Sequence, residues 1–191
     1  MNFNQFINKQ DIEMTQDEQN VFQFLQQYDE QWASIFQDKL LTGRDKVTKR
    51  LVTSIHRENL VHGNDHSQLL NRRKFAGYDT HVTDILEIHF PKSKLYLYAP
   101  VTGQHAFNRI DVEGPFYYKR EQYQDEFKRI LHPNDILDWI LTESPELDNE
   151  ASQQFRDDQT NSAANMTFAL SYQYFKMKDD RAPLYLSLIH I

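Results

Sequence analysis

Apolar residues in the first quarter of the chain repeat with the period of an α-helix. Thr15 and Glu18 have the spacing of a capping box, which predicts that a helix begins near Gln16. Steps of three and four place the following apolar residues on one face: Val21, Phe22, Leu25, Tyr28, Trp32, Ile35, Phe36 and Leu40. Gly43 is typical of a helix C-terminus. A second helix is therefore predicted over residues 44–59, with its basic residues in solvent and Gly43 as the corner of a helical hairpin.

A period of two replaces the helical period between residues 84 and 119. Leu86, Ile88 and Phe90 alternate with polar residues, as in a half-buried strand. Further strands are predicted over residues 94–101, 104–112 and 116–118, with turns at Thr102-Gly103 and at residues 113–115. In the strand over residues 94–101 the leucines and the tyrosines occupy opposite faces. Because parallel neighbours need long crossovers, these short connections predict an antiparallel meander.

The remaining segments complete an α+β pattern. Residues 62–80 follow neither period and read as a loop or a ragged hairpin. Pro133 is predicted in the first turn of a short helix, and Pro145 just inside a second one that runs to residue 178, as one helix or as two broken near Thr160. The apolar positions of that last segment are Leu147, Ala151, Phe155, Met166, Ala169, Leu170 and Tyr174. The expected fold has N-terminal helices, a central antiparallel β-meander and a C-terminal long helix, with helices on one face of the sheet.

Composition narrows the class of protein. A length of 191 residues suits one domain. The net charge of −7 argues against a nucleic-acid partner, so the basic run at residues 72–74 is interpreted as a solvated loop. The absence of cysteine excludes disulfides and thiolate chemistry, and fits a reducing compartment. The N-terminus has no signal-peptide pattern and no apolar run reaches about 20 residues, so a cytoplasmic protein without a membrane partner is expected.

Candidate chemistry in the sequence is sparse. His62 and His66 have the spacing of a helical metal pair, but the glycine between them disfavours a helix and no third ligand is placed by spacing. The consecutive residues Asp65, His66 and Ser67 cannot form a hydrolase triad, because neighbouring side chains point apart. His105 and Arg109 would share a face of the third strand, where a cation could meet an anionic substrate or simply lie at the surface.

The sequence therefore assigns no catalytic, cofactor-binding or metal-ligating residue. Its five glycines are scattered, and neither glycine-rich phosphate-binding motif occurs. The end of the chain carries a different signal. Residues 186–191 read as the translation of a transposon adaptor used in sequencing libraries, so we expect residues 1–185 to be an incomplete protein with a non-native tail at 186–191.

The order of several short motifs resembles the N-terminal part of the IucA/IucC-type, NRPS-independent siderophore synthetases, the staphyloferrin-type members in particular. The resemblance spans roughly residues 15–180, and its motifs are, in order, Ala99-Pro100-Val101, His105-Ala106-Phe107, Gly114-Pro115-Phe116 and Asn161-Ser162 with Asn165. The family's fold is compared to a hand, and this chain is similar to its N-terminal thumb. The family's catalytic signature, with Gly-His-Pro, His-Pro and Lys followed by Ser-x-Arg-Thr, has no counterpart in the chain.

The resemblance implies an ATP- and Mg-dependent ligase that activates a carboxylate of citrate as an adenylate and joins it to an amine, an amino acid or an alcohol. ATP and Mg are expected on the full-length enzyme and not on this chain, which would be inactive alone and would expose an apolar face where the other domains dock. The family also leaves a homodimer open. The alternative is a stand-alone binding domain that uses the tyrosine-rich face of its sheet, without catalysis.

Overall fold

The computed structural model describes residues 12–58, 60–61, 66–75, 81–106, 109–122 and 126–178. The helices are α1 (Gln16–Tyr28), α2 (Glu30–Glu58), α3 (Pro133–Glu143) and α4 (Glu150–Lys178). The strands are β1 (Ser67–Asn71), β2 (Asp84–Phe90), β3 (Leu95–Gln104), β4 (Ile110–Val112), β5 (Tyr117–Arg120) and β6 (Lys128–Arg129), with short 3-10 turns at Arg72–Lys74 and Pro145–Leu147. The α+β class, the antiparallel sheet and the long C-terminal helix are as predicted.

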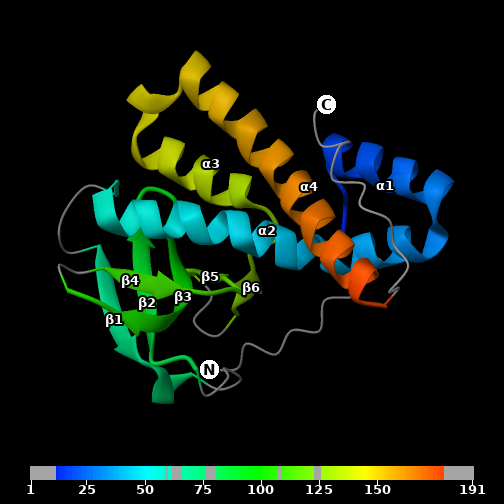
Figure 1. Ribbon diagram of the computed structural model, residues 1–191. Helices are drawn as coiled ribbons and strands as arrows, with labels where there is room; N and C mark the ends of the chain where they lie inside the picture. The colour runs from blue at the N-terminus through cyan, green and yellow to red at the C-terminus, as the bar shows by residue number, and fades with distance from the viewer. Residues whose placement is uncertain are drawn as a thin grey trace.

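The six strands form one antiparallel sheet in the order β1-β2-β3-β5-β6, and β4 pairs with the far end of β3. Figure 1 shows α2 lying across the sheet, with α3 and α4 beside it on the same side. The main core lies between the sheet and this helical layer. It includes the predicted inward residues of β2 and β3, together with Leu51, Val52 and Ile55 of α2 and Ile136 and Ile140 of α3. Helices therefore cover one face of the sheet, as expected.

The tyrosine side of the sheet holds a smaller core of its own. Tyr98 and Tyr117 are buried there against Phe75 and Phe127, and Tyr96 packs at the edge. The alternation of leucine and tyrosine in β3 is thus confirmed. Tyr98 is only 2% exposed and Tyr117 only 7%, so these two rings are closed to a partner, whereas Tyr96 is half-buried.

The predicted hairpin corner at Gly43 is wrong. Helix α1 does begin at Gln16, with both hydrogen bonds of the Thr15–Glu18 capping box in place, but it ends at Tyr28. Asp29 separates the helices: its amide donates to the carbonyl of Leu25, and its carboxylate accepts from the amide of Trp32 at 2.9 Å. Gly43 lies inside α2, where it allows a close approach by α4. A Cβ atom built on Gly43 would lie 2.1 Å from the Thr167 hydroxyl oxygen.

Two strand boundaries in the structure also differ from the predicted ones. Strand β3 runs on through Thr102-Gly103 to Gln104, because the chain shifts register by a bulge between Val101 and Gly103 and continues to pair with β4. The turn predicted at Thr102-Gly103 is therefore wrong, and the third strand shrinks to Ile110–Val112. Within the unassigned segment at residues 62–80, Ser67–Asn71 forms edge strand β1 along β2.

Helix α3 starts at Pro133 as predicted, whereas the start at Pro145 proves to be a 3-10 turn that precedes α4. Helix α4 is continuous past Thr160. Its predicted apolar face is largely wrong, since Phe155 and Tyr174 are 40% and 42% exposed. The buried positions of α4 are small or hydroxylated, because the helix packs closely against α2: Ala163, Ala164, Thr167 and Ser171.

Within the described part of the chain, no helix combines the length and the apolarity that a membrane span requires. The predicted tail at residues 186–191 lies outside the described residues.

Candidate functional site

Two of the sequence motifs, at residues 99–101 and 114–116, lie where β3 and β4 meet α2, and Phe107 of the motif between them lies outside the described residues. Ala99, Pro100 and Val101 are buried in β3, and the carbonyl of Pro100 accepts a hydrogen bond of 2.9 Å from the amide of Glu113. Val101 pairs with Val112 across the strands. The motif at residues 99–101 therefore anchors the strand pair.

The Gly114-Pro115-Phe116 turn lies directly against α2. A Cβ atom on Gly114 would lie 2.6 Å from the carboxylate carbon of Asp45, so no larger residue fits without displacing that side chain. Phe116 is fully buried in the main core. This turn thus brings the end of β4 onto the acidic side chain of Asp45.

Asp45 forms a largely buried ion pair with Arg129 of β6. The two side chains are 15% and 19% exposed, and Arg129 Nη2 lies 2.6 Å from Asp45 Oδ2. Burial raises the pKa of Asp45 to about 6, although the guanidinium of Arg129 opposes that rise. The pair joins helix α2 to the last strand of the sheet.

A charged rim surrounds this turn at the surface. We define it as Lys46, Lys49, Glu113, His105 and Asp111. The ammonium groups of Lys46 and Lys49 lie 3.2 and 2.8 Å from the carboxylate of Glu113, and the hydrogen bond from Lys49 lowers the pKa of Glu113. His105 Nε2 lies 2.7 Å from Asp111 Oδ2, and this hydrogen bond lowers the pKa of Asp111. Each basic side chain of the rim is thus already paired with a carboxylate.

His105 and Arg109 do not share a strand face as predicted. Both lie outside β3 and β4, in the connection between them, where the His105 amide donates to the Arg109 carbonyl at 2.8 Å. Both side chains are exposed. The arrangement agrees with the surface alternative, because the imidazole of His105 is held by Asp111.

Sequence reasoning missed a second polar centre, at Arg44 in the middle of α2, one residue before Asp45. Arg44 was predicted in solvent, yet it is 4% exposed and pairs with the fully buried Glu18 of α1 at 2.5 Å. It also donates to the carbonyls of Glu13 and Leu131. No local pattern could reveal this pair, because the partners lie 26 residues apart. Glu18 therefore both caps helix α1 and pairs with the buried charge of Arg44.

His132 lies beside this ion pair as the N-cap residue of α3. Its Nδ1 accepts a hydrogen bond of 3.2 Å from the amide of Asn134. Burial and the nearby Arg44 charge lower the pKa of His132 to about 4. The ring is therefore neutral near pH 7, as an acceptor at the helix start must be.

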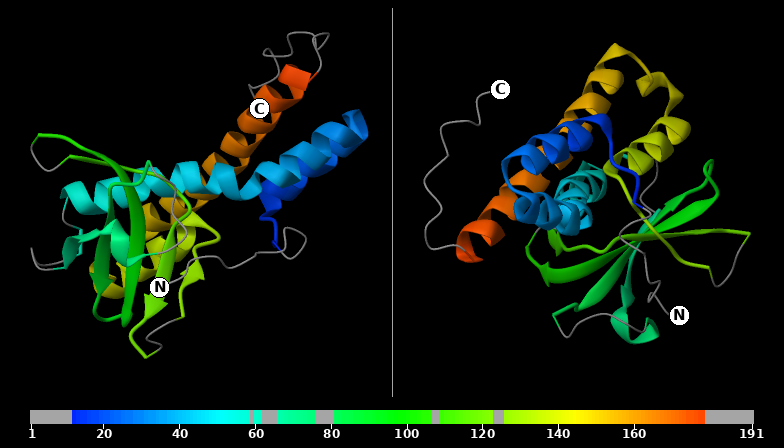
Figure 2. Two further views of the ribbon diagram at one scale, coloured as in Figure 1. Left: turned by 90° about the horizontal axis from the view of Figure 1, so that it is seen from below. Right: turned by 90° about the vertical axis from the view of Figure 1, so that its right-hand side faces the viewer.

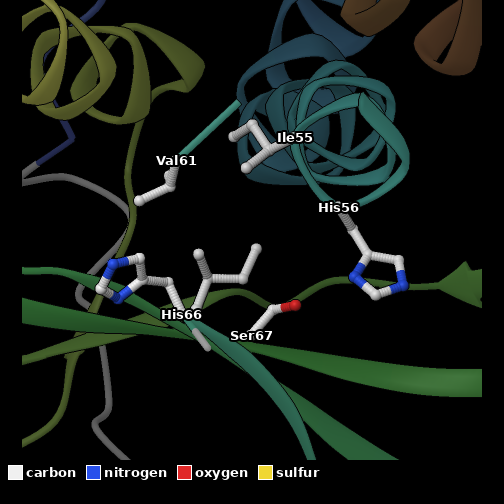
Figure 3. Close-up of a pocket in the computed structure, with 6 residues that line it drawn as sticks. Ile55, His56, Val61, His66 and Ser67 are labelled. Carbon is white, nitrogen blue, oxygen red and sulfur yellow. The ribbon is translucent and has the colours of Figure 1, made fainter. Parts of the chain in front are cut away.

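Only His66 of the predicted histidine pair can be placed, because His62 lies outside the described residues. Asp65, from the Asp65-His66-Ser67 run, lies outside them too. His66 lines a small crevice with Ile55, His56, Val61, Ser67 and Ile88, and Figure 3 shows the rings of His56 and His66 on opposite sides of it. The crevice measures about 10 Å³, roughly the space of one water molecule. Among the described residues, no three His, Asp or Glu side chains gather as metal ligands.

The last motif lies on α4. Ala163 and Ala164, inside the Asn161–Asn165 segment, are buried, whereas Asn161 and Asn165 are exposed and hydrogen-bond to each other. Within this motif, the small buried residues Ala163 and Ala164 let α4 pack closely against α2.

These groups do not fit a nucleotide with its metal ion. A triphosphate needs cations and N–H donors aimed at one point, together with carboxylates that hold a divalent ion. The lysines of the rim, Arg44 and Arg129 are each held by a carboxylate of the chain itself. The described residues form a packed scaffold with a charged rim.

Comparison with known proteins supports one relationship. The chain is 51% identical over 185 residues to a D-ornithine–citrate ligase of Staphylococcus aureus (strain NCTC 8325 / PS 47). The match covers 97% of this chain and 28% of that ligase, so the chain spans less than a third of the relative's length. No family model matches the chain, and no solved structure matches it.

Proposed function

We propose that the chain is the N-terminal thumb domain of a citrate ligase of the IucA/IucC type, the family that its motifs resemble, because it is similar along its length to a D-ornithine–citrate ligase. The observation that supports this proposal is the 51% identity to the D-ornithine–citrate ligase along almost the entire chain. The proposed enzyme activates a carboxylate of citrate with ATP and Mg, and an amine then attacks the adenylate. The amine is D-ornithine or a close analogue, by the name of the relative.

In this proposal the thumb contributes shape and the rest of the enzyme contributes the chemistry. The paired charges of the rim leave the neutralisation of the triphosphate to residues outside this chain. A ligase that consumes ATP would act in the cytoplasm, where the nucleotide is made. The proposal also treats residues 1–185 as native protein and residues 186–191 as a tail that is not.

The stand-alone binding domain is less well supported. Its proposed surface was the tyrosine-rich face of the sheet, and Tyr98 and Tyr117 of that face are buried. No other observation favours it.

The test begins with the source DNA. We expect the reading frame to continue past residue 185 into a Gly-His-Pro, His-Pro and Lys signature. The encoded full-length protein, purified and mixed with citrate, MgATP and D-ornithine, should form an amide product and release AMP and pyrophosphate in equal amounts. L-Ornithine is the matched control substrate, and residues 1–185 alone should form no product. A genuine stop codon near residue 185, or a full-length protein that is inactive with citrate and every amine offered, would refute the proposal.

A further inference from the structure

The three most exposed large apolar side chains in the described residues lie at one end of the helical layer. Met177 is 80% exposed, Phe24 is 55% exposed and Tyr28 is 52% exposed. Tyr174, at 42%, is the fourth apolar side chain of this end. We call these four residues the apolar tip.

A shared aromatic core holds the tip together. The Trp32 ring stacks on Phe175 at a centroid distance of 5.1 Å and meets Tyr28 edge-on at 5.9 Å. Its indole N–H donates to the Ser171 hydroxyl at 3.0 Å. Tyr28 from α1 and the last turns of α4 are therefore fixed around one tryptophan, which brings the exposed ends of both helices to the same part of the molecule.

The tip is separate from the core that covers the sheet. Leu25, Trp32, Ala33, Phe36 and Leu40 form a cluster of their own with aromatic residues of α4. Figure 2 shows α1, the first half of α2 and the end of α4 extending beyond the sheet. Among the described residues, this cluster contains no residue of the strands, and Phe24, Tyr28 and Tyr174 are exposed beside it.

We propose that the apolar tip is the surface on which the remainder of the synthetase polypeptide docks. This inference rests on the proposed function, in which the chain is part of a longer enzyme. Two observations favour that occupant. The chain matches only 28% of its relative, so most of such an enzyme lies outside these residues. Helix α4 has its last described residue, Lys178, next to Met177, so a continuing chain is tethered beside the tip.

The tether and the side chains explain why docking would be favourable. A covalently linked partner is present at an effective concentration near millimolar, so a modest interface is enough to hold it. Burying large apolar and aromatic side chains is what distinguishes the centre of an interface from its rim. A second copy of the chain lacks that tether, and its binding would depend on protein concentration.

The test measures thiol accessibility in the full-length enzyme. The chain has no cysteine, so a cysteine placed at Phe24→Cys or Met177→Cys can be followed on its own peptide by mass spectrometry after timed iodoacetamide labelling. The matched control is Gln153→Cys, an exposed position nearer the start of α4. We expect both tip cysteines to react about tenfold or more slowly than the control, at every protein concentration, and to match the control in urea.

Equal labelling rates at the tip and at the control would overturn the inference, and so would protection that disappears on dilution, since that indicates a second copy. The ligase assay on the Gln153→Cys enzyme separates the two proposals. Protection without citrate-dependent activity would refute the proposed function and keep the docking surface. Activity without protection would support the proposed function and refute the docking surface. If one tip variant fails to fold, the other still decides, because the two lie on different helices.

Discussion

Replacing Gly43 with alanine places a methyl group in the contact between α2 and α4. The new Cβ would lie 2.1 Å from the Thr167 hydroxyl oxygen, 2.8 Å from the Thr167 amide nitrogen and 2.9 Å from its Cα. The hydroxyl could move by giving up its 2.8 Å hydrogen bond to the Ala163 carbonyl. The two backbone atoms cannot move separately, because they belong to a helix of 29 residues. The helices must therefore shift apart.

Two effects of opposite sign set the size of the change. Glycine to alanine inside a helix stabilises by about 1 kcal/mol through backbone entropy. Overpacking a tight contact costs about 1–3 kcal/mol, and the upper end applies when backbone atoms block the new group. The steric term is the larger, so we expect Gly43→Ala to lower the free energy of unfolding by about 1–2 kcal/mol.

Urea unfolding followed by tryptophan fluorescence measures this change, since Trp32 of α2 packs against Phe168 and Phe175 of α4 and reports on the contact between the two helices. Ser34→Ala is the matched control, because it changes an exposed position of α2 and should be neutral or slightly stabilising. Adding Thr167→Ala to Gly43→Ala should restore only part of the loss, since the backbone contacts persist. If Gly43→Ala instead stabilises the protein as an exposed helix glycine would, the close approach of α2 and α4 is refuted.

Two further predictions concern buried charges. Arg44→Met should lower the free energy of unfolding by about 3–5 kcal/mol, because it leaves the Glu18 carboxylate buried without its partner. Adding Glu18→Gln to the same chain should recover much of that loss, as measured by urea titration. Equal losses in the single and double variants would contradict this prediction. Burial raises the pKa of Asp45 to about 6 from 3.8, so the folded state binds this proton more tightly and stability should fall as pH rises from about 4 to about 6. Asp45→Asn should remove that part of the slope, which urea midpoints across this pH range would show, and an unchanged slope would exclude Asp45 as its source.

The local pattern of apolar and polar residues was sufficient to predict an element wherever one face of that element is buried against a continuous surface. The alternation in β2 and β3 predicted which residues enter the main core, and the capping box at Thr15 and the proline at 133 predicted two helix starts. Short connections predicted antiparallel pairing. These features depend on residues within a few positions of one another, so the sequence alone reveals them.

The motifs of the family were also readable from the sequence, and the relative confirms the resemblance that they predicted. Their physical role was not readable. Gly114 is needed because Asp45 lies against it, and the exposed pair His105–Asp111 forms only because the connection after β3 returns the chain to β4.

By itself the sequence determined the class of fold, the strand faces and the resemblance to a citrate ligase. The tertiary structure decided where α1 ends, why α2 continues through Gly43, and which charges are buried. Each of those outcomes depends on a partner distant in the chain. Gly43 meets Thr167, and Arg44 meets Glu18. A periodic pattern reports which residues share a face, but only packing decides what that face meets, and here α4 meets α2 through its small residues because close approach excludes large ones.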